Sequence, residues 1–340
     1  MAHAAGLRYT TDQRPSIARR KAGSGFIYLR ADGTRVTDAE TLRRIRHLVV
    51  PPAWTDVWIC TDPQGHLQAT GRDAKGRKQY RYHDRWNEVR NENKYQRMLE
   101  FAAALPRIRR RYRRDIRDRT LTRRRVLATV VYLLEKTLIR VGNDEYARSN
   151  RSFGLTTLRE RHVAVRGSTV RFRFRGKSGH EHDVEVSDRR IAAAIRRLEE
   201  LPGQDLFQYI DDAGELQRIA SEDVNEYLRQ ISGQEFTAKH FRTWAGTVLC
   251  VSALQALDGV GGEPAVKRNI VCAVAQVARR LGNTAAVCRR CYIHPEVLAA
   301  YGDGTLVREA APAVEDSIRG LRSDEVAALG LLRRRLARAA

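Results

Sequence analysis

Long apolar runs are missing from this sequence of 340 residues. A helix that crosses a bilayer needs about 20 consecutive apolar residues, and the sequence has no such stretch. The segment from Met1 to Arg20 also lacks the apolar core of a secretion signal. We therefore expect a cytoplasmic protein with no membrane partner.

Cysteine is scarce, and its count is odd. In a chain of this length, five cysteines argue for free thiols rather than for a disulfide framework. Cys288 and Cys291 have the spacing of a redox pair or of half a zinc site, but no second pair completes one. We interpret both as ordinary helix residues. The other three are Cys60, Cys250 and Cys272.

Motifs for nucleotide or metal chemistry are also missing. The segment Gly176-Lys177-Ser178 ends like a phosphate-binding loop, but Arg171 stands where that loop needs its earlier glycine. There is no H-E-x-x-H motif and no dense carboxylate cluster suited to Mg²⁺. His180 and His182 could place two imidazoles on one strand face, although alternation in a sheet explains them more simply. We therefore expect no metal site and no cofactor, with a divalent cation at most stimulating turnover.

Acidic residues are too few to balance the basic ones. Sixty-two Lys and Arg stand against 40 Asp and Glu, which gives a net charge of +22. Such a chain is expected to bind a polyanion, with nucleic acid as the default and an anionic membrane surface as the alternative. From Arg107 to Arg125 the sequence contains 11 arginines and only two aspartates. A charge run is usually a solvated helix face, but these arginines exceed what internal pairs could neutralise, so a phosphate-facing role is at least as well supported.

The first part of the chain, residues 1–92, reads as a small α+β domain. Apolar runs at 25–29 and 57–60 predict strands, with turn residues beside them. Residues 37–48 predict a helix that stops before two prolines.

Residues 93–340 are mainly helical and predict a larger domain. Residues 126–140 are apolar nearly all round, as a buried helix should be, and stop at Gly142-Asn143. Period-two alternation predicts a three-stranded β meander inside this domain. Its strands are 162–166, 170–175 and 180–186, and later helices are expected to begin after N-caps at Asp188, Ser221 and Thr237.

Five residues in this second part form an ordered constellation. The spacings are 37, 65, 41 and nine residues, along the series Arg140, Lys177, Arg242, Asn283 and Tyr292. This order resembles the active site of the type IB DNA topoisomerases, in their bacterial and poxvirus-like branch. No single one of these residues indicates the family specifically, but all five in this order do.

The resemblance extends from about Ser24 to about Gly304. Residues 71–82 are similar to the family's DNA-contacting strand segment, and residues 50–54 and 152–158 also look like family sequence. The resemblance implies a monomer whose N-terminal DNA-binding domain (1–92) and C-terminal catalytic domain (93–340) form a C-shaped clamp around duplex DNA. It implies DNA contacts from Arg77, Gln79, Tyr80, Tyr82, Tyr146 and Lys239.

The implied chemistry suits these residue types. A phenol ionises near pH 10 in water, so Tyr292 needs help to attack a phosphodiester and form a 3′-phosphotyrosine. The planar guanidiniums of Arg140 and Arg242 can form paired hydrogen bonds to the nonbridging oxygens and so stabilise the negative charge of the transition state. Lys177 would protonate the leaving 5′ oxygen, and Asn283 would donate one hydrogen bond.

Each residue also has a simpler interpretation. Arg140 could neutralise the dipole at the end of its own helix, and Lys177 could be an exposed turn lysine. Asn283 could be only an N-cap, and Tyr292 could be half-buried packing. The order of the five residues favours the functional interpretation over these alternatives. For Gln79 and the two tyrosines near it, a generic strand surface is the alternative.

The sequence departs from the family pattern at two positions. Asn283 stands where many members carry histidine, so one hydrogen bond is kept but a positive charge is lost. We expect slower cleavage or a different pH response, not a different mechanism. Asn143 replaces a basic residue of the poxvirus enzymes.

The expected function is ATP-independent relaxation of supercoiled DNA of either sign, with nonspecific affinity that falls steeply with salt and association with the nucleoid. A tyrosine recombinase is the closest alternative, but it typically has histidine where Lys239 stands and a helical N-terminal domain. A noncatalytic DNA-binding architectural protein is the alternative of a different class. It would be unaffected by Tyr292→Phe.

Overall fold

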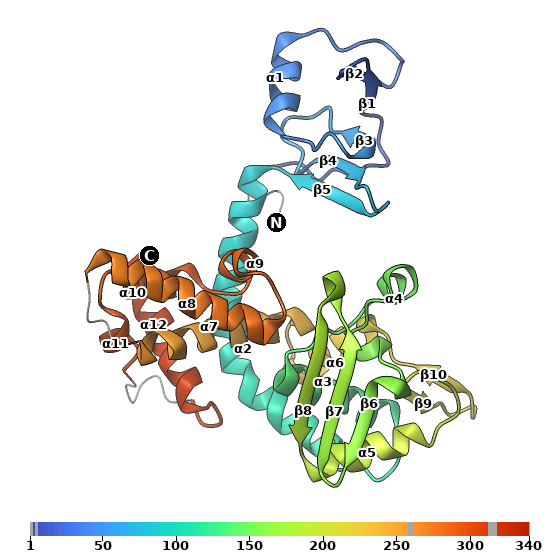
Figure 1. Cartoon of the computed structure of the whole chain (residues 1–340), viewed down its shortest axis with the longest axis vertical. Helices are drawn as coiled ribbons and strands as arrows, with labels where there is room; N and C mark the ends of the chain where they lie inside the picture. Colours follow the sequence, from blue (N-terminus) through green and yellow to red (C-terminus); the bar gives the residue numbers. More distant parts are fainter. Residues whose placement is uncertain (1–2, 4–5, 258–261, 312–317, 340) are drawn as a thin grey trace. The chain divides into compact units, whose positions relative to one another are not determined.

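A computed structural model describes residue 3 and residues 6–257, 262–311 and 318–339, apart from the side chains of residues 88, 90–94, 146 and 339 (Figure 1). The chain divides into two units, residues 1–96 and residues 97–340, and each is described here by itself. Within the described part, every helix is too short or too polar to cross a membrane.

The first unit is built on a five-stranded antiparallel sheet with one short helix, α1 (Ala39–His47). The strands lie in the order β2-β1-β3-β4-β5. Their bounds are β1 (Ile17–Ala22), β2 (Gly25–Leu29), β3 (Thr55–Ile59), β4 (Leu67–Arg72) and β5 (Lys78–Tyr82). The strands and the helix expected in this part of the sequence are therefore confirmed.

Apolar side chains on one face of this sheet pack under α1. Ile17 and Ile59 are fully buried there together with Ile45 of the helix. Asp38 begins α1 as its N-cap, accepting a hydrogen bond of 2.8 Å from the Thr41 amide. The sheet therefore has a covered face, and its last strand, β5, lies at an edge.

The second unit is mainly helical and contains a three-stranded antiparallel sheet in the order β6-β7-β8. These strands are β6 (Val163–Arg166), β7 (Thr169–Arg175) and β8 (Glu181–Ser187), with a short ribbon of β9 (Gln208–Ile210) and β10 (Leu216–Arg218). Helix α5 (Arg189–Glu199) packs against β6 and β7 (Figure 1). The predicted meander and the predicted α+β class are confirmed.

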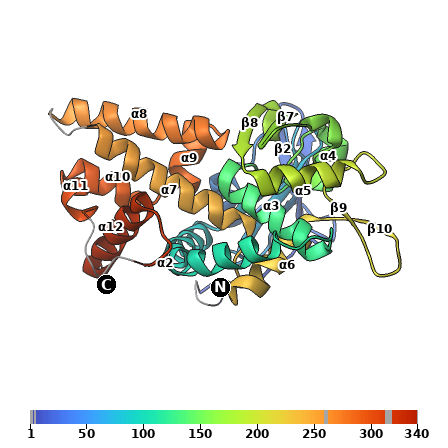
Figure 2. The same cartoon turned by 90° about the horizontal axis from the view of Figure 1, so that it is seen from below.

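The remaining helices surround this sheet or form the helical half of the unit (Figure 2). They are α2 (Asp84–Asp115, which begins in the first unit), α3 (Arg123–Thr137), α4 (Asp144–Asn150), α6 (Ser221–Ser232), α7 (Ala238–Ala256), α8 (Glu263–Leu281), α9 (Ala285–Cys291), α10 (Pro295–Gly302), α11 (Leu306–Glu309) and α12 (Ser323–Ala339). Cys288 and Cys291 are helix residues, as expected, and all five cysteines are free thiols.

Helix α3 is buried nearly all round, as its composition predicts, but it ends earlier than expected. Leu138 takes a left-handed conformation (φ 58°) and closes the helix before Arg140, so Gly142 and Asn143 lie beyond its end. Asp188 and Thr237 occupy N-cap positions as predicted. At α6, however, the N-cap position is Ala220 and not Ser221.

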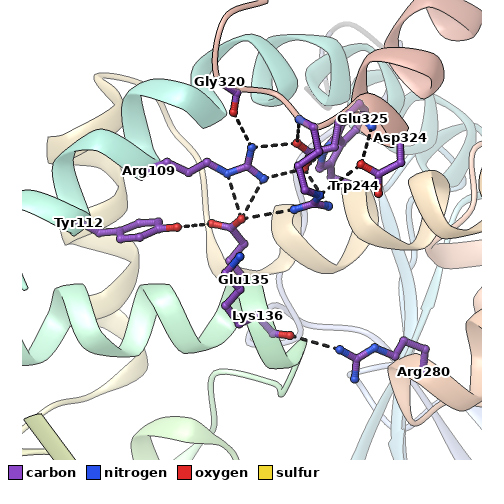
Figure 3. A network of polar contacts seen from close by, with 10 residues as sticks. Arg109, Tyr112, Glu135, Lys136, Trp244, Arg280, Gly320, Asp324 and Glu325 are labelled. Carbon is purple, nitrogen blue, oxygen red and sulfur yellow. Dashed lines mark hydrogen bonds and ion pairs between the residues drawn. The ribbon is translucent and has the colours of Figure 1, made fainter. Parts of the chain in front are cut away.

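A buried ionic network joins α2, α3, α7 and the start of α12 (Figure 3). Arg109 donates to both carboxylate oxygens of Glu325 at 2.7 and 2.8 Å and to Glu135 at 2.9 Å. Tyr112 donates to Glu135 at 2.6 Å, and the Trp244 indole donates to Glu325 at 3.4 Å. Burial alone would raise the pKa of Glu325, but the hydrogen bond from Arg109 lowers it.

The phosphate-facing role expected for the arginines of residues 107–125 therefore does not extend to the whole run. Arg109 is buried and paired with two glutamates. Arg125 is buried and donates to the Arg119 carbonyl at 3.2 Å. The sequence could not reveal these partners, because only the fold brings Glu135 and Glu325 beside Arg109.

Candidate active site

Arg140 lies in the loop that follows α3, and the backbone of a distant segment holds this loop in place. The Leu155 amide donates to the Arg140 carbonyl at 2.9 Å, and the Thr156 amide donates to the next carbonyl at 2.7 Å. Gly142 and Gly154 touch so closely that a Cβ on Gly154 would lie 2.6 Å from the Gly142 backbone. Residues 152–158, which look like family sequence, therefore brace the loop that carries Arg140.

The guanidinium of Arg140 reaches across to the turn between α8 and α9. It donates to the Gly282 carbonyl at 3.3 Å and to the side-chain oxygen of Asn283. Asn283 is not the N-cap of α9, because Thr284 occupies that position. Arg140 therefore faces the end of α8 and not the end of its own helix.

Arg242 projects from the second turn of α7 and is 4% exposed. It donates to the Leu138 carbonyl at the end of α3 and, at 2.7 Å, to the Leu281 carbonyl at the end of α8. Two helix C-termini, which carry partial negative charge, thus hold one cation in a fixed orientation.

The two guanidiniums have no carboxylate among their recorded hydrogen-bond partners in the described chain. Burial, together with the nearby Arg242 cation, lowers the pKa of Arg140 to about 10. Two donors are also buried without a hydrogen-bond partner of good geometry, the Nε of Arg242 and the Nδ2 of Asn283. Concentrated positive charge with unused donors is the arrangement expected of an anion site.

Tyr292 follows α9 directly, and its ring lies beside Arg242. The guanidinium carbon of Arg242 is 5.2 Å from the ring centroid. Thr247 of α7 donates to the Tyr292 carbonyl at 3.3 Å. A Cβ on Gly246 would lie 2.7 Å from that carbonyl oxygen, so only glycine lets α7 approach this closely.

Lys177 is exposed at the tip of the β7–β8 hairpin and makes no recorded side-chain contact with the other four residues. The base of this hairpin, however, is tied to the loop that carries Arg140. The Phe153 amide donates to the Arg175 carbonyl at 2.8 Å, and the Gly176 amide donates to the His180 carbonyl at 2.7 Å. The structure thus brings together Arg140, Arg242, Asn283 and Tyr292, and it places Lys177 on a hairpin fixed beside them.

His182 links this hairpin to the turn that carries Asn283. Its ring stacks on Phe174 at a centroid distance of 4.8 Å. A Cβ on Gly176 would lie 2.6 Å from the ring, and a Cβ on Gly282 would lie 2.8 Å from it. Burial and the cations of the site lower the pKa of His182 to about 4, so the ring is neutral at pH 7.

The sequence pattern explains His182 by strand alternation, with a metal ligand as the alternative, and does not single out Gly246 or Thr247. A glycine inside a helical pattern is a recognisable sign of close packing, so Gly246 carried a signal that could have been used. Thr247 carried none. Among the described residues, no group of three His, Cys, Asp or Glu side chains is placed to hold a metal ion.

The residues expected to contact DNA from the first unit lie on and beside the edge strand β5. Tyr80 and Tyr82 lie on one face with their rings stacked 6.0 Å apart, and Tyr80 is 47% exposed. Gln79 points to the other face and donates to Asp73 at 2.9 Å. Arg77 also bonds to Asp73, at 2.7 Å, and this hydrogen bonding lowers the pKa of Asp73 to about 2.

In the second unit, Lys239 is exposed in the first turn of α7. Its neighbour His240 turns inward and accepts a hydrogen bond from the Thr237 amide at 3.0 Å. Tyr146 belongs to α4, but its side chain lies outside the described residues.

Comparison with protein families gives two matches along the chain. Residues 83–310 match the model described as eukaryotic DNA topoisomerase I, catalytic core. Residues 25–73 match the model of the bacterial DNA topoisomerase IB N-terminal domain.

Individual relatives agree with these matches. A DNA topoisomerase 1B of Acanthamoeba polyphaga mimivirus is 33% identical over 292 residues, covering 84% of this chain and 87% of the relative. A DNA topoisomerase I of Monkeypox virus is 22% identical over 290 residues, covering 83% of this chain and 88% of the relative. A DNA topoisomerase 1B of Vaccinia virus (strain Copenhagen) is 21% identical over 290 residues, with the same coverage. The chain belongs to the type IB DNA topoisomerases, in the branch of the bacterial and poxvirus enzymes.

Proposed function

We propose that this topoisomerase relaxes supercoiled duplex DNA by cutting and resealing one strand through Tyr292. The phenol oxygen attacks a backbone phosphorus, the bond to the 5′ oxygen breaks, and a 3′-phosphotyrosine forms. The cut strand rotates about the intact one. The 5′ hydroxyl then attacks the same phosphorus and releases the tyrosine. One phosphodiester replaces another at each step, so no ATP is consumed.

The single observation that carries this proposal is the paired cation site beside the Tyr292 ring. Arg140 and Arg242 are oriented by neutral carbonyls and an amide, so their charge is available to an anion. The transition state of phosphoryl transfer spreads negative charge over nonbridging oxygens. Cations fixed before the reaction stabilise that charge without having to reorganise.

Asn283 contributes a neutral donor to the same site. Its oxygen accepts from Arg140, which leaves the Nδ2 group as the donor for a nonbridging oxygen. Because an amide is not protonated near pH 7, Asn283 contributes a hydrogen bond to the site but no positive charge.

We assign Lys177 the role of general acid for the leaving 5′ oxygen. Its exposed position on a braced hairpin allows its Nζ to reach bound DNA, while Gly176 and His182 fix the base of the hairpin. In the return step the same amine takes the proton back from the 5′ hydroxyl.

We propose that two domains contact the duplex, residues 1–92 as a DNA-binding domain and residues 93–340 as the catalytic domain. The exposed, stacked pair Tyr80 and Tyr82 would face the DNA, with Gln79, Arg77, Lys239 and Tyr146 as further contacts. One chain carries all five catalytic residues, so a monomer is sufficient. The net charge of +22 favours association with the nucleoid.

The test is relaxation of negatively supercoiled plasmid in EDTA without ATP. We expect the wild type and Tyr209→Phe, a control tyrosine in β9, to relax the plasmid, and Tyr292→Phe to bind it without relaxing it. Equal activity of Tyr292→Phe would exclude the proposed nucleophile. A strand-exchange assay between two duplexes distinguishes a recombinase.

A further inference from the structure

A second cationic site lies on the surface of α2, away from the residues assigned to catalysis. A cavity of about 360 Å³ opens between α2 and α6. Four of its six lining residues are arginines, and Ile231 is the one apolar member. The residues are Arg107, Arg110, Arg111, Arg114, Gln230 and Ile231.

The helical repeat explains why these arginines gather. Positions 107, 110, 111 and 114 follow the i, i+3, i+4, i+7 spacing and therefore share one face of α2. Arg109 and Tyr112 point to the opposite face, into the buried network of Figure 3. Arg109 thus points inward to acidic partners, whereas an outward set lies around the cavity, made up of Arg107, Arg110, Arg111 and Arg114.

The outward set is only partly neutralised within the described chain. Arg114 lies 3.3 Å from Asp115, which also accepts a hydrogen bond from Tyr227. Arg107 lies against Gly233, at the C-terminal end of α6. Among the described residues, Arg110 and Arg111 have no carboxylate partner, and the Nε of Arg111 is buried without a hydrogen-bond partner. A buried donor without an acceptor is unfavourable unless a ligand supplies one.

We propose that this cavity binds a chain of phosphate groups. Guanidinium forks match phosphate oxygens in pairs, and the cavity has room for several phosphates, since a water molecule takes about 30 Å³ of liquid. The phosphates belong either to a free oligophosphate or to a stretch of DNA backbone outside the catalytic site. The site goes beyond the proposed nicking reaction, because it shares no residue with it.

The first experiment measures binding of sodium tripolyphosphate to the full chain by calorimetry. Arg110→Glu and Arg111→Gln should each weaken binding about tenfold or more, because each removes charge-assisted hydrogen bonds. The matched control is Arg113→Glu, which makes the same charge change at an exposed position of α2 outside the cavity. Circular dichroism and thermal unfolding verify that the variants are folded. If Arg110→Glu and Arg113→Glu weakened tripolyphosphate binding equally, the net charge of the protein would explain the effect, and the proposal would be overturned.

The second experiment identifies the source of the phosphates. The enzyme is first saturated with one short duplex, and binding of a second, fluorescent duplex is then titrated. Loss of this second binding in Arg110→Glu, but not in Arg113→Glu, assigns the cavity to DNA backbone. Loss of tripolyphosphate binding alone assigns it to a free oligophosphate. If neither ligand distinguishes the two variants, the cavity is not a phosphate site.

Discussion

The guanidinium carbon of Arg242 lies 5.2 Å from the centre of the Tyr292 ring. This is within the distance at which a cation is attracted to an aromatic face. The same side chain is fixed by the carbonyls that end α3 and α8. Arg242 therefore contacts the Tyr292 ring and at the same time provides part of the anion site.

Arg242→Lys should abolish most of the activity although the charge is kept. The side chain of lysine has a single nitrogen, so it cannot bond to the carbonyls of Leu138 and Leu281 and also form paired hydrogen bonds to a phosphate. We expect the rate of single-turnover cleavage to fall by about 100-fold or more, as for loss of one preorganised donor. Arg280→Lys, at an exposed arginine of α8 that donates to the Lys136 carbonyl at 3.3 Å, is the control and should cleave normally. Comparable cleavage by both variants would contradict the assigned role.

Gly246→Ala should impair cleavage without destabilising the helix. Alanine is intrinsically the better helix former by about 1 kcal/mol, but its Cβ would lie 2.7 Å from the Tyr292 carbonyl and must displace it. We expect at least about tenfold slower cleavage at unchanged DNA affinity, measured by rapid quench and by gel shift. Gly302→Ala adds the same methyl group where, among the described residues outside the adjoining part of its own helix, no atom lies within 4 Å, and it should behave as the wild type.

Gly176→Ala should weaken the proton transfer assigned to Lys177. The new Cβ would meet the His182 ring at 2.6 Å, so the hairpin must move. Cleavage should slow about tenfold on normal DNA, yet remain near the wild-type rate when sulfur replaces the bridging 5′ oxygen, because a thiolate leaves without a proton. Gly25→Ala, a strand glycine with space around it, is the control. Equal slowing on both substrates would show that the hairpin does not act through the leaving group.

Glu325→Ala should destabilise the second unit by about 3 kcal/mol, the size expected when a buried ion pair loses one partner. Arg109 would keep Glu135 but lose its two-oxygen partner in α12. The neighbouring Asp324→Ala removes a partly exposed partner of Arg322 and should cost less than about 1 kcal/mol. Urea unfolding measures both changes. Equal losses at the two positions would contradict the importance of the buried network.

Stability should fall as the pH drops from about 6.5 to about 4. Burial lowers the pKa of His162, His182 and His240 to about 4. In this window the unfolded chain binds protons that the folded chain excludes, so each histidine removes up to about 1.4 kcal/mol per pH unit. Urea unfolding at several pH values should show a shallower slope for His162→Asn, which can still accept from the Arg159 amide. The same slope for His162→Asn and for the wild type would contradict the contribution of this histidine.

Local patterns predicted the elements that carry the site. Alternation from Val170 to Arg175 gave β7, and Thr237 marked the start of α7. The resemblance to family sequence identified the four residues that the structure brings together, Arg140, Arg242, Asn283 and Tyr292. Their roles in the reaction stay predictions until the variants are measured.

The supports of the site could not be predicted in the same way. The Leu155 amide bonds to the Arg140 carbonyl, and the Phe153 amide bonds to the Arg175 carbonyl. These bonds join backbone groups from segments far apart in sequence, and every residue except proline carries such groups. The partners of Arg109 were hidden for a related reason, since Glu135 and Glu325 come from helices that only the fold places beside it.

The backbone acceptors of Arg242 have an evolutionary consequence. Leu138 and Leu281 hold the guanidinium with carbonyl oxygens, which any amino acid at those positions would also provide. Substitutions there alter packing but delete no acceptor. A chain built in this way can accumulate many mutations around its reactive centre while the geometry of that centre is inherited through the main chain.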